Sequence, residues 1–305
     1  MYTIKEASAR SGVGIPLLRA WERRYAVVAP TRTPSGYRLY DNAAIGRLQS
    51  MRQLIDAGWS ARQAAERVRG ATDADLSELT SSPAPAGTAR NGSSIEDLIG
   101  RLVTAARLID ATDLEAALDE AFSSARFEGA TDRVVMPALR AIGDAWERGD
   151  ISVAGEHAAS HAVLRRLAMA FEAAGDPGSE RPVLVGLGSG GRHELGALAF
   201  ATAARRAGLP VLYLGPDLPP QSWTSAAERR SAVAAVIGVP TRADVPRARA
   251  VVEELRSARP DILLAVGGEQ AARLGSSDGV LVLPGGLTDA VAMLRSALPA
   301  RTRAR

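Results

Sequence analysis

The spacing of hydrophobic residues changes along the 305-residue chain, and each change predicts a different kind of structure. Residues 1–70 carry apolar positions at helical spacing, with one turn-rich interruption at residues 29–36 that predicts a β-hairpin wing. Residues 71–93 are rich in Ser, Thr, Pro, Ala and Gly, a composition that buries too little apolar surface to fold alone. We therefore expect an N-terminal helical domain followed by a flexible linker.

Residues 94–177 keep the helical spacing of apolar residues, broken only by short polar or glycine-containing segments. Four helices joined by short loops are typical of an antiparallel bundle, which we expect here. The predicted helices cover residues 95–110, 113–128, 132–149 and 152–175.

Over residues 180–299 short apolar runs alternate with amphipathic helical segments. This alternation predicts a doubly wound parallel sheet, a Rossmann-like domain with helices on both faces. The predicted strands cover residues 182–187, 211–214, 232–239, 262–266 and 280–283. The predicted fold class is thus a multidomain α and α/β protein.

Composition then limits the classes of function. The chain contains no cysteine, which excludes disulfides, thiolate metal sites and cysteine nucleophiles. Its three histidines, His157, His161 and His193, are the remaining imidazole ligands. The N-terminus does not resemble a signal peptide, and no run of about 18 apolar residues lacks a charge, so we expect a cytoplasmic protein with no membrane partner.

Charge is distributed unevenly. Residues 1–70 hold 12 Lys or Arg and 5 Asp or Glu, whereas the rest of the chain holds 25 and 29. The basic N-terminal end is therefore the part expected to bind a polyanion such as double-stranded DNA.

The basic end also has the pattern of a helix-turn-helix. Residues 4–11 and 15–25 are predicted helices joined by a glycine turn at residues 12–14, an arrangement that presents the second helix to the major groove. Arginine suits this role because its planar fork pairs with phosphate oxygens or a guanine edge. The candidate DNA-binding residues on the second helix and the wing are Arg19, Arg23, Arg24, Tyr25, Arg32, Ser35, Tyr37 and Arg38.

The sequences LRAWERRY at residues 18–25 and PSGYRLY at residues 34–40 resemble the MerR family of regulators. The resemblance implies a winged helix-turn-helix over residues 1–70 that binds an operator. A purely structural alternative is a solvated basic helix with Trp21 and Tyr25 in a small core, and for Trp21 itself we favour the core position.

A glycine-rich loop follows the first predicted strand of the sheet, and it contains His193. Loops at the carboxyl ends of parallel strands are where doubly wound sheets bind ligands. Such a loop could also cradle a phosphate, but residues 188–196 lack both a strict dinucleotide fingerprint and a P-loop lysine.

The spacing around His193 is similar to that of the cobalamin-binding fold of methionine synthase and methylmalonyl mutases. In that family, Asp-x-His-x-x-Gly precedes Ser-x-Leu and then Gly-Gly. Here His193 and Gly196 are followed after 41 residues by Gly238-Val239-Pro240, and after 26 more by Gly267 and Gly268. The resemblance implies that His193 binds the cobalt of cobalamin while the glycines leave room for its nucleotide tail.

This chain departs from the cobalamin-binding pattern in two places. Gly191 stands where the family has an aspartate that orients the ligand histidine, so that support is weaker or comes from another group. Gly238 and Pro240 replace the Ser and Leu, which removes a hydroxyl partner for the buried base.

The bundle carries a second resemblance, to the upper-face cap of light-sensing cobalamin repressors of the CarH type. Trp146 is followed after nine residues by Glu156 and His157, residues that the resemblance places near the adenosyl group. Glu147 replaces the histidine that takes the upper cobalt position after illumination, and a carboxylate is the weaker ligand for cobalt(III). Structural alternatives are a core position for Trp146, and a metal or packing pair for His157 with His161.

Together these features predict a regulator rather than an enzyme, most simply a repressor whose oligomeric state and DNA affinity respond to adenosylcobalamin and to light. Methylcobalamin and hydroxocobalamin are the other expected forms of the cofactor. The helix following the wing is short, so we expect a dimer or tetramer to form through the C-terminal half. The alternatives are a corrinoid methyl-transfer protein and a regulator whose decayed cobalamin domain binds other proteins.

Overall fold

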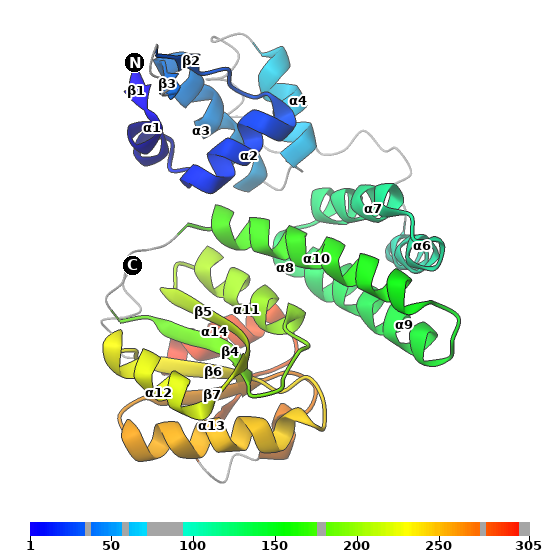
Figure 1. The fold of residues 1–305 in the computed structure, drawn as a ribbon, viewed down its shortest axis with the longest axis vertical. Helices are drawn as coiled ribbons and strands as arrows, with labels where there is room; N and C mark the ends of the chain where they lie inside the picture. Colours follow the sequence, from blue (N-terminus) through cyan, green and yellow to red (C-terminus); the bar gives the residue numbers. More distant parts are fainter. Residues whose placement is uncertain (34–37, 57–60, 72–93, 176–180, 275–278, 299–305) are drawn as a thin grey trace. The chain divides into compact units, whose positions relative to one another are not determined.

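The computed structural model describes the chain in six segments, which form two compact units covering residues 1–175 and 176–305 (Figure 1). The described residues are 1–33, 38–56, 61–71, 94–175, 181–274 and 279–298. The predicted linker lies outside them except for Ala71, as does the tip of the predicted wing at residues 34–36. In the described residues no helix is long and apolar enough to cross a membrane.

The N-terminal part of the first unit is a helical module with a small antiparallel sheet in the order β1-β3-β2. Thr3 and Glu6 form a capping box that starts α1, and Gly12 at φ +68° ends it, which produces the predicted turn before α2. Trp21 is 2% exposed and lies in the core with Leu18, which confirms its predicted structural position. The elements are β1 Tyr2–Thr3, α1 Ile4–Ser11, α2 Ile15–Tyr25, β2 Thr31–Arg32, β3 Arg38–Tyr40, α3 Asn42–Asp56 and α4 Ala61–Gly70.

The second part of this unit contains the long helices predicted for the bundle. The third of them does not start as a regular helix, because a short helix and a π-helical turn precede it. At the start of α10, a Cβ on Gly155 would lie 2.3 Å from the carbonyl oxygen of Ala106, so glycine permits the close approach of α10 to α6. The elements are α6 Ile95–Leu108, α7 Ala111–Ser124, α8 Phe127–Ala130, the π turn Thr131–Val135, α9 Met136–Glu147 and α10 Val153–Ala173.

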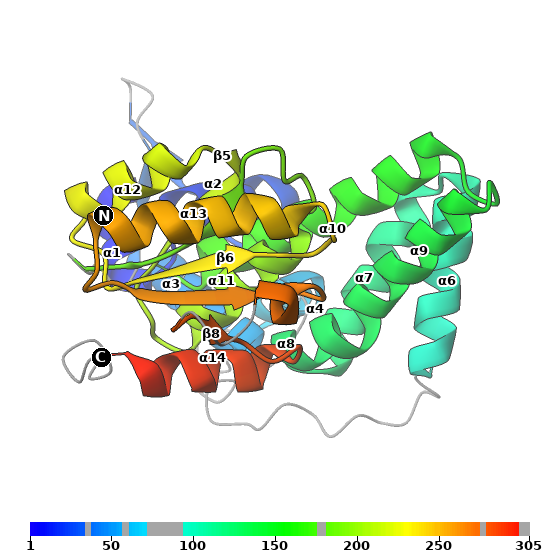
Figure 2. The ribbon, with the colours of Figure 1, turned by 90° about the horizontal axis from the view of Figure 1, so that it is seen from below.

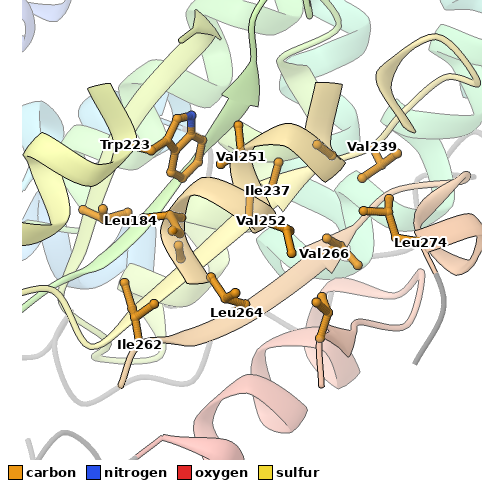
Figure 3. Close-up of a cluster of buried hydrophobic side chains, with 14 of the residues drawn as sticks. Leu184, Trp223, Ile237, Val239, Val251, Val252, Ile262, Leu264, Val266 and Leu274 are labelled. Carbon is orange, nitrogen blue, oxygen red and sulfur yellow. The ribbon is translucent and has the colours of Figure 1, made fainter. Parts of the chain in front are cut away.

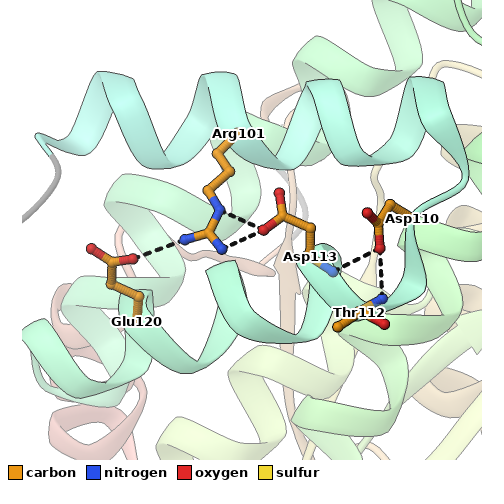
Figure 4. Close-up of polar contacts among 5 residues, drawn as sticks. All are labelled: Arg101, Asp110, Thr112, Asp113 and Glu120. Carbon is orange, nitrogen blue, oxygen red and sulfur yellow. Dashed lines mark hydrogen bonds and ion pairs between the residues drawn. The ribbon is translucent and has the colours of Figure 1, made fainter.

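A charged network joins α6 to α7 (Figure 4). The Arg101 guanidinium donates to the Asp113 carboxylate, with its Nε 2.8 Å from Oδ1, and lies 3.0 Å from Glu120. Asp110 caps α7 by accepting from the backbone of Thr112 and Asp113 at 3.0 Å. The Arg101 guanidinium lowers the pKa of Asp113 below its ordinary value, so the ionised carboxylate holds the two helices together.

The second unit is a parallel sheet in the order β5-β4-β6-β7-β8, with helices on both faces. Helices α11 and α14 pack together on one face, and α12 and α13 on the other (Figures 1 and 2). The chain passes from β4 to β5 on one side and then crosses to β6 on the other side of β4, so a topological switch point lies between β4 and β6. The elements are β4 Val183–Gly188, α11 Leu195–Arg206, β5 Val211–Leu218, α12 Pro220–Arg229, β6 Ala234–Gly238, α13 Asp244–Ala258, β7 Leu263–Gly267, β8 Leu281–Val282 and α14 Leu287–Ala297.

The core of this unit explains its strand pattern (Figure 3). Leu184 and Ile237 on the central strands are fully buried, as is Trp223 from α12. A strand covered on both faces needs apolar residues at every position rather than at alternate ones, which is why the runs are continuous. The predicted fold class is confirmed: the protein combines helical domains with a doubly wound parallel sheet.

Candidate functional site

The predicted recognition helix is α2, and its two faces differ. On one face of α2 the side chains of Leu18 and Trp21 are buried. On the other, Arg19 is exposed and Tyr25 is partly exposed. The structure describes the backbone but not the side chains of Arg23, Arg24 and Arg32, and Ser35 and Tyr37 lie outside the described residues. Among the predicted arginines of α2, the structure describes the side chain of Arg19, and that side chain is exposed.

The predicted contact residue Arg38 has a partner within the same module. Its Nε donates to both carboxylate oxygens of Glu22, at 3.0 and 3.1 Å, and the Tyr40 hydroxyl donates to Glu22 at 3.2 Å. Burial, followed by the nearby Glu22 charge, raises the pKa of Tyr40 to about 12. Glu22 thus ties β3, which follows the wing, to the recognition helix, a role that sequence reasoning missed.

In the sheet unit, His193 lies after β4 and two residues before the start of α11, at the carboxyl edge beside the switch point, and it is exposed. The preceding loop is held against α13. A Cβ on Gly188 would lie 3.0 Å from the Arg247 carbonyl oxygen, and one on Gly190 would lie 3.1 Å from the Arg247 guanidinium. These glycines are therefore required by close packing.

This packing argues against the phosphate-cradle interpretation of the loop. The Asp217 carboxylate accepts the backbone N–H of Gly190 at 2.5 Å, so a donor that a phosphate would need is already used. The buried carboxylate of Asp244 also lies on the loop side, where a Cβ on Gly191 would be 3.3 Å from its Oδ1. Asp244 is paired with Arg247, so it is the Asp217 carboxylate at the Gly190 N–H that would repel an anion.

Two further contacts come from β5. The Asp217 backbone N–H donates to the Gly191 carbonyl at 3.0 Å, and the Tyr213 hydroxyl donates to the Glu194 carboxylate at 2.7 Å. Burial, then the hydrogen bond to Glu194, raises the pKa of Tyr213 above its ordinary value. Sequence reasoning missed both residues, although the polar residues that end this strand were a signal.

The predicted glycine positions lie at the ends of neighbouring strands. Gly238 and Gly267 are paired in register at the carboxyl ends of β6 and β7, and both are partly exposed. A Cβ on Gly267 would meet nothing nearer than 3.9 Å, whereas Gly268, at φ +110°, lies against Val239. Gly196 occupies the first turn of α11. The exposed imidazole of His193 and the uncovered backbone of Gly267 fit a large cofactor whose metal takes a nitrogen ligand.

On the bundle, the predicted cap residues lie at the end of α9 and the start of α10. Trp146 is 45% exposed, so it is not the core aromatic of the structural alternative, and Glu147 is exposed beside it. The Glu156 carboxylate accepts from Ser160 at 2.6 Å and lies 2.7 Å from Nδ1 of His157. An uncovered tryptophan next to an ordered carboxylate and an imidazole is a surface suited to a polar, flat ligand.

His161 meets His157 edge to face, with ring centroids 6.2 Å apart. Across the part of the chain that the structure describes, no three His, Cys, Asp or Glu side chains group so as to hold a metal ion. Among the described residues, no third side chain joins His157 and His161 to complete a metal site.

Comparison with known proteins identifies the kinds of domain that the chain contains. Residues 2–70 match the MerR HTH family regulatory proteins, and residues 98–170 match the B12 binding domain. The sheet and bundle resemble the monomethylamine corrinoid protein of Methanosarcina barkeri, with a TM-score of 0.56 and 12% identity over 66% of this chain and 98% of that one. The chain is thus of the class that joins a MerR-type helix-turn-helix to a B12-binding domain.

Whole-chain relatives define the family. The chain is 31% identical to the HTH-type transcriptional repressor CarH of Myxococcus xanthus over 218 residues, 72% of each protein. It is 27% identical to CarA of the same organism over 260 residues, 84% of this chain and 83% of that one. The protein belongs to the CarH family of HTH-type transcriptional regulators, and it is not an enzyme.

Proposed function

We propose that this protein is a cobalamin-dependent transcriptional repressor that binds its operator through α2 and the wing and binds adenosylcobalamin through His193. The observation that carries the proposal is the exposed His193 at the switch point of the sheet, in a chain that also has a MerR-type module. As a DNA-binding regulator of transcription, it would act in the cytoplasm.

The cofactor, when bound, would supply a cobalt centre and, in the adenosyl form, a cobalt–carbon bond that light can break. His193 would hold the cobalt through an imidazole nitrogen. Gly238, Gly267 and Gly268 would leave backbone space for the nucleotide tail, and Gly196 would permit close approach at the first turn of α11. Methylcobalamin and hydroxocobalamin would share these contacts, because they differ only in the upper ligand.

From the bundle, Trp146, Glu156 and His157 would offer contacts to the adenosyl group. Glu147 offers cobalt(III) a weaker ligand than imidazole does. We therefore propose that the light signal in this protein is the loss of the bulky adenosyl group from its contact with Trp146, rather than ligation by Glu147.

Oligomer formation would connect the sensor to DNA. A single basic module makes weak, salt-dependent phosphate contacts, whereas two or four linked modules bind the same DNA with much greater avidity. We propose that the C-terminal half forms the dimer or tetramer, and that loss of the adenosyl group alters its subunit contacts.

The experiment that tests cobalamin binding is absorbance spectroscopy of the full chain mixed with adenosylcobalamin in the dark and then desalted. The wild-type protein should retain red pigment, and His193→Ala should change its spectrum, while His161→Ala serves as the matched histidine control. Failure of the wild type to retain pigment would overturn the proposal in favour of a decayed cobalamin domain. An unchanged His193→Ala spectrum would overturn the assignment of His193.

A further inference from the structure

The position that orients the ligand histidine in the cobalamin-binding family is Gly191 in this chain, and a side chain there would be tightly packed against its neighbours. A Cβ on Gly191 would lie 3.0 Å from the Gly188 carbonyl oxygen and 3.1 Å from Cβ of Leu187. It would also lie 3.3 Å from the carboxylate of Asp244, which is 2% exposed. An aspartate at Gly191 would therefore collide with backbone and place two carboxylates together.

Asp244 is not available to replace the missing aspartate, because its oxygens are already used. They accept from the Thr241 hydroxyl at 2.6 Å, the Thr241 N–H at 3.1 Å and the Arg247 guanidinium at 2.8 Å. These bonds hold the turn before α13 and the start of that helix. Support for His193 must therefore come from the other side of the loop, where β5 lies.

Strand β5 holds the loop on the N-terminal side of His193 through Asp217. The Asp217 carboxylate accepts the Gly190 N–H at 2.5 Å, and its own N–H donates to the Gly191 carbonyl at 3.0 Å. Asp217 has φ +55°, a conformation that costs free energy in residues other than glycine and persists only when surrounding contacts enforce it. The pairing of β4 with β5 shifts register after Val185, so the two strands are not regularly paired near this contact.

The same strand holds the C-terminal side of His193 through Tyr213. Its hydroxyl donates to the Glu194 carboxylate at 2.7 Å, and the residue is partly buried beside β4. Glu194 directly follows His193 and directly precedes α11. The exposed imidazole thus projects from a loop fastened on both sides to one strand.

We propose that Tyr213 and Asp217 are the positioning residues of His193 and perform the role that the family gives to the aspartate at Gly191. Each acts through the loop: Asp217 fixes the backbone of Gly190 and Gly191, and Tyr213 fixes Glu194. The inference rests on the proposed function, because it concerns the geometry with which His193 reaches cobalt. Groups that orient a metal ligand typically change metal affinity 10- to 100-fold when removed.

The test uses the full chain with adenosylcobalamin in the dark and measures the dissociation constant and the fraction of cobalt bound to histidine, read from the absorbance spectrum. Asp217→Gly removes the carboxylate without straining a positive φ, and Asp217→Asn keeps an acceptor oxygen and tolerates that φ. We expect Asp217→Gly and Tyr213→Phe each to weaken binding about 10-fold and lower the histidine-bound fraction, and Asp217→Asn to restore most of both.

Matched controls separate positioning from general stability. Tyr2→Phe and Asp261→Asn make the same chemical changes away from the His193 loop and should leave both readouts unchanged. If Tyr213 acts through Glu194, the double variant Tyr213→Phe with Glu194→Ala should bind no more weakly than Glu194→Ala alone. Thermal unfolding of the ligand-free variants shows whether they remain folded, and the Asp217→Gly and Asp217→Asn pair keeps the test decisive if Tyr213→Phe does not fold.

Wild-type affinity and an unchanged histidine-bound fraction in Asp217→Gly and Tyr213→Phe would overturn the inference. That result differs from failure of the proposed function, in which the wild-type chain retains no cobalamin or His193→Ala leaves its spectrum unchanged. In that case the proposed ligation and this inference fail together.

Discussion

At the scale of single residues, Gly191 stands where the cobalamin-binding family has an aspartate. This one difference changes which residues can support the His193 loop. The surrounding atoms leave the position suited to glycine alone, and the nearest carboxylate, Asp244, is buried and ionised. Burial by itself would raise the pKa of Asp244, but hydrogen bonds from Thr241 and Arg247 outweigh burial and hold that pKa below its ordinary value. A second acid beside it would therefore be unfavourable.

Gly191→Asp is the direct test of this account of the position. We expect the variant to lose about 1–3 kcal/mol of unfolding free energy through overpacking, and to gain no affinity for cobalamin. Gly100→Asp is the matched control, since a Cβ on Gly100 in α6 meets nothing within 4 Å. Denaturant unfolding of the two variants gives the comparison, and an unfolding free energy for Gly191→Asp equal to that of the wild type would contradict the account.

At the scale of elements, sequence reasoning found the strands better than it found their ends. The run at residues 211–214 was recognised because it is apolar, but β5 continues to Leu218 through Gly215, Pro216 and Asp217, which carry no strand signal. That unrecognised extension supplies Asp217. The contacts of Glu22, Tyr213 and Asp244 were likewise beyond prediction, because they join residues through the fold rather than through a local pattern. In contrast, the helices at residues 4–11 and 15–25 and the loop with His193 after β4 follow local patterns, and the structure has them where the sequence predicts them.

The connection between α2 and β3 leads to a prediction about DNA binding. If Arg38 acts by fixing the wing through Glu22, Arg38→Gln should weaken operator binding and leave the slope of log affinity against log salt unchanged. Arg19→Gln, at an exposed position of α2, should instead reduce that slope by about 1, because a phosphate contact is lost. Gel shifts over a salt series measure both slopes, and an equal reduction in the two variants would show that Arg38 contacts phosphate.

The connection between α6 and α7 leads to a prediction about acid stability. Because Arg101 lowers the folded-state pKa of Asp113 below the ordinary 3.8, the ion pair contributes at neutral pH and is lost as the pH falls through the folded-state pKa. Asp113→Asn should therefore cost about 0.5–1 kcal/mol at neutral pH, a modest value because the pair is partly exposed, and nothing in strong acid. Thermal unfolding across pH tests this, and a difference that persists in acid would contradict it.

At the scale of the whole molecule, the proposed function depends on coupling between cobalamin binding and operator binding. The DNA-binding module matches the MerR family, whereas the sheet keeps the histidine and the paired glycines of the cobalamin-binding pattern but not its aspartate. The bundle offers Trp146, Glu156 and His157, while the sheet offers His193. A ligand shifts a conformational equilibrium only when it binds the two states of the protein with different affinities. The account therefore requires that forms of cobalamin with different upper ligands favour different states, and that these states differ in operator affinity.

The most direct measurement is operator affinity by gel shift, paired with molecular size, for wild-type and His193→Ala protein with adenosylcobalamin in the dark and after illumination. The account predicts that the cofactor raises wild-type affinity and oligomer size in the dark, with an affinity gain of about 10-fold or more, and that light reverses both. His193→Ala should show neither response. Equal affinity and equal size of the wild-type protein with and without the cofactor would contradict the account.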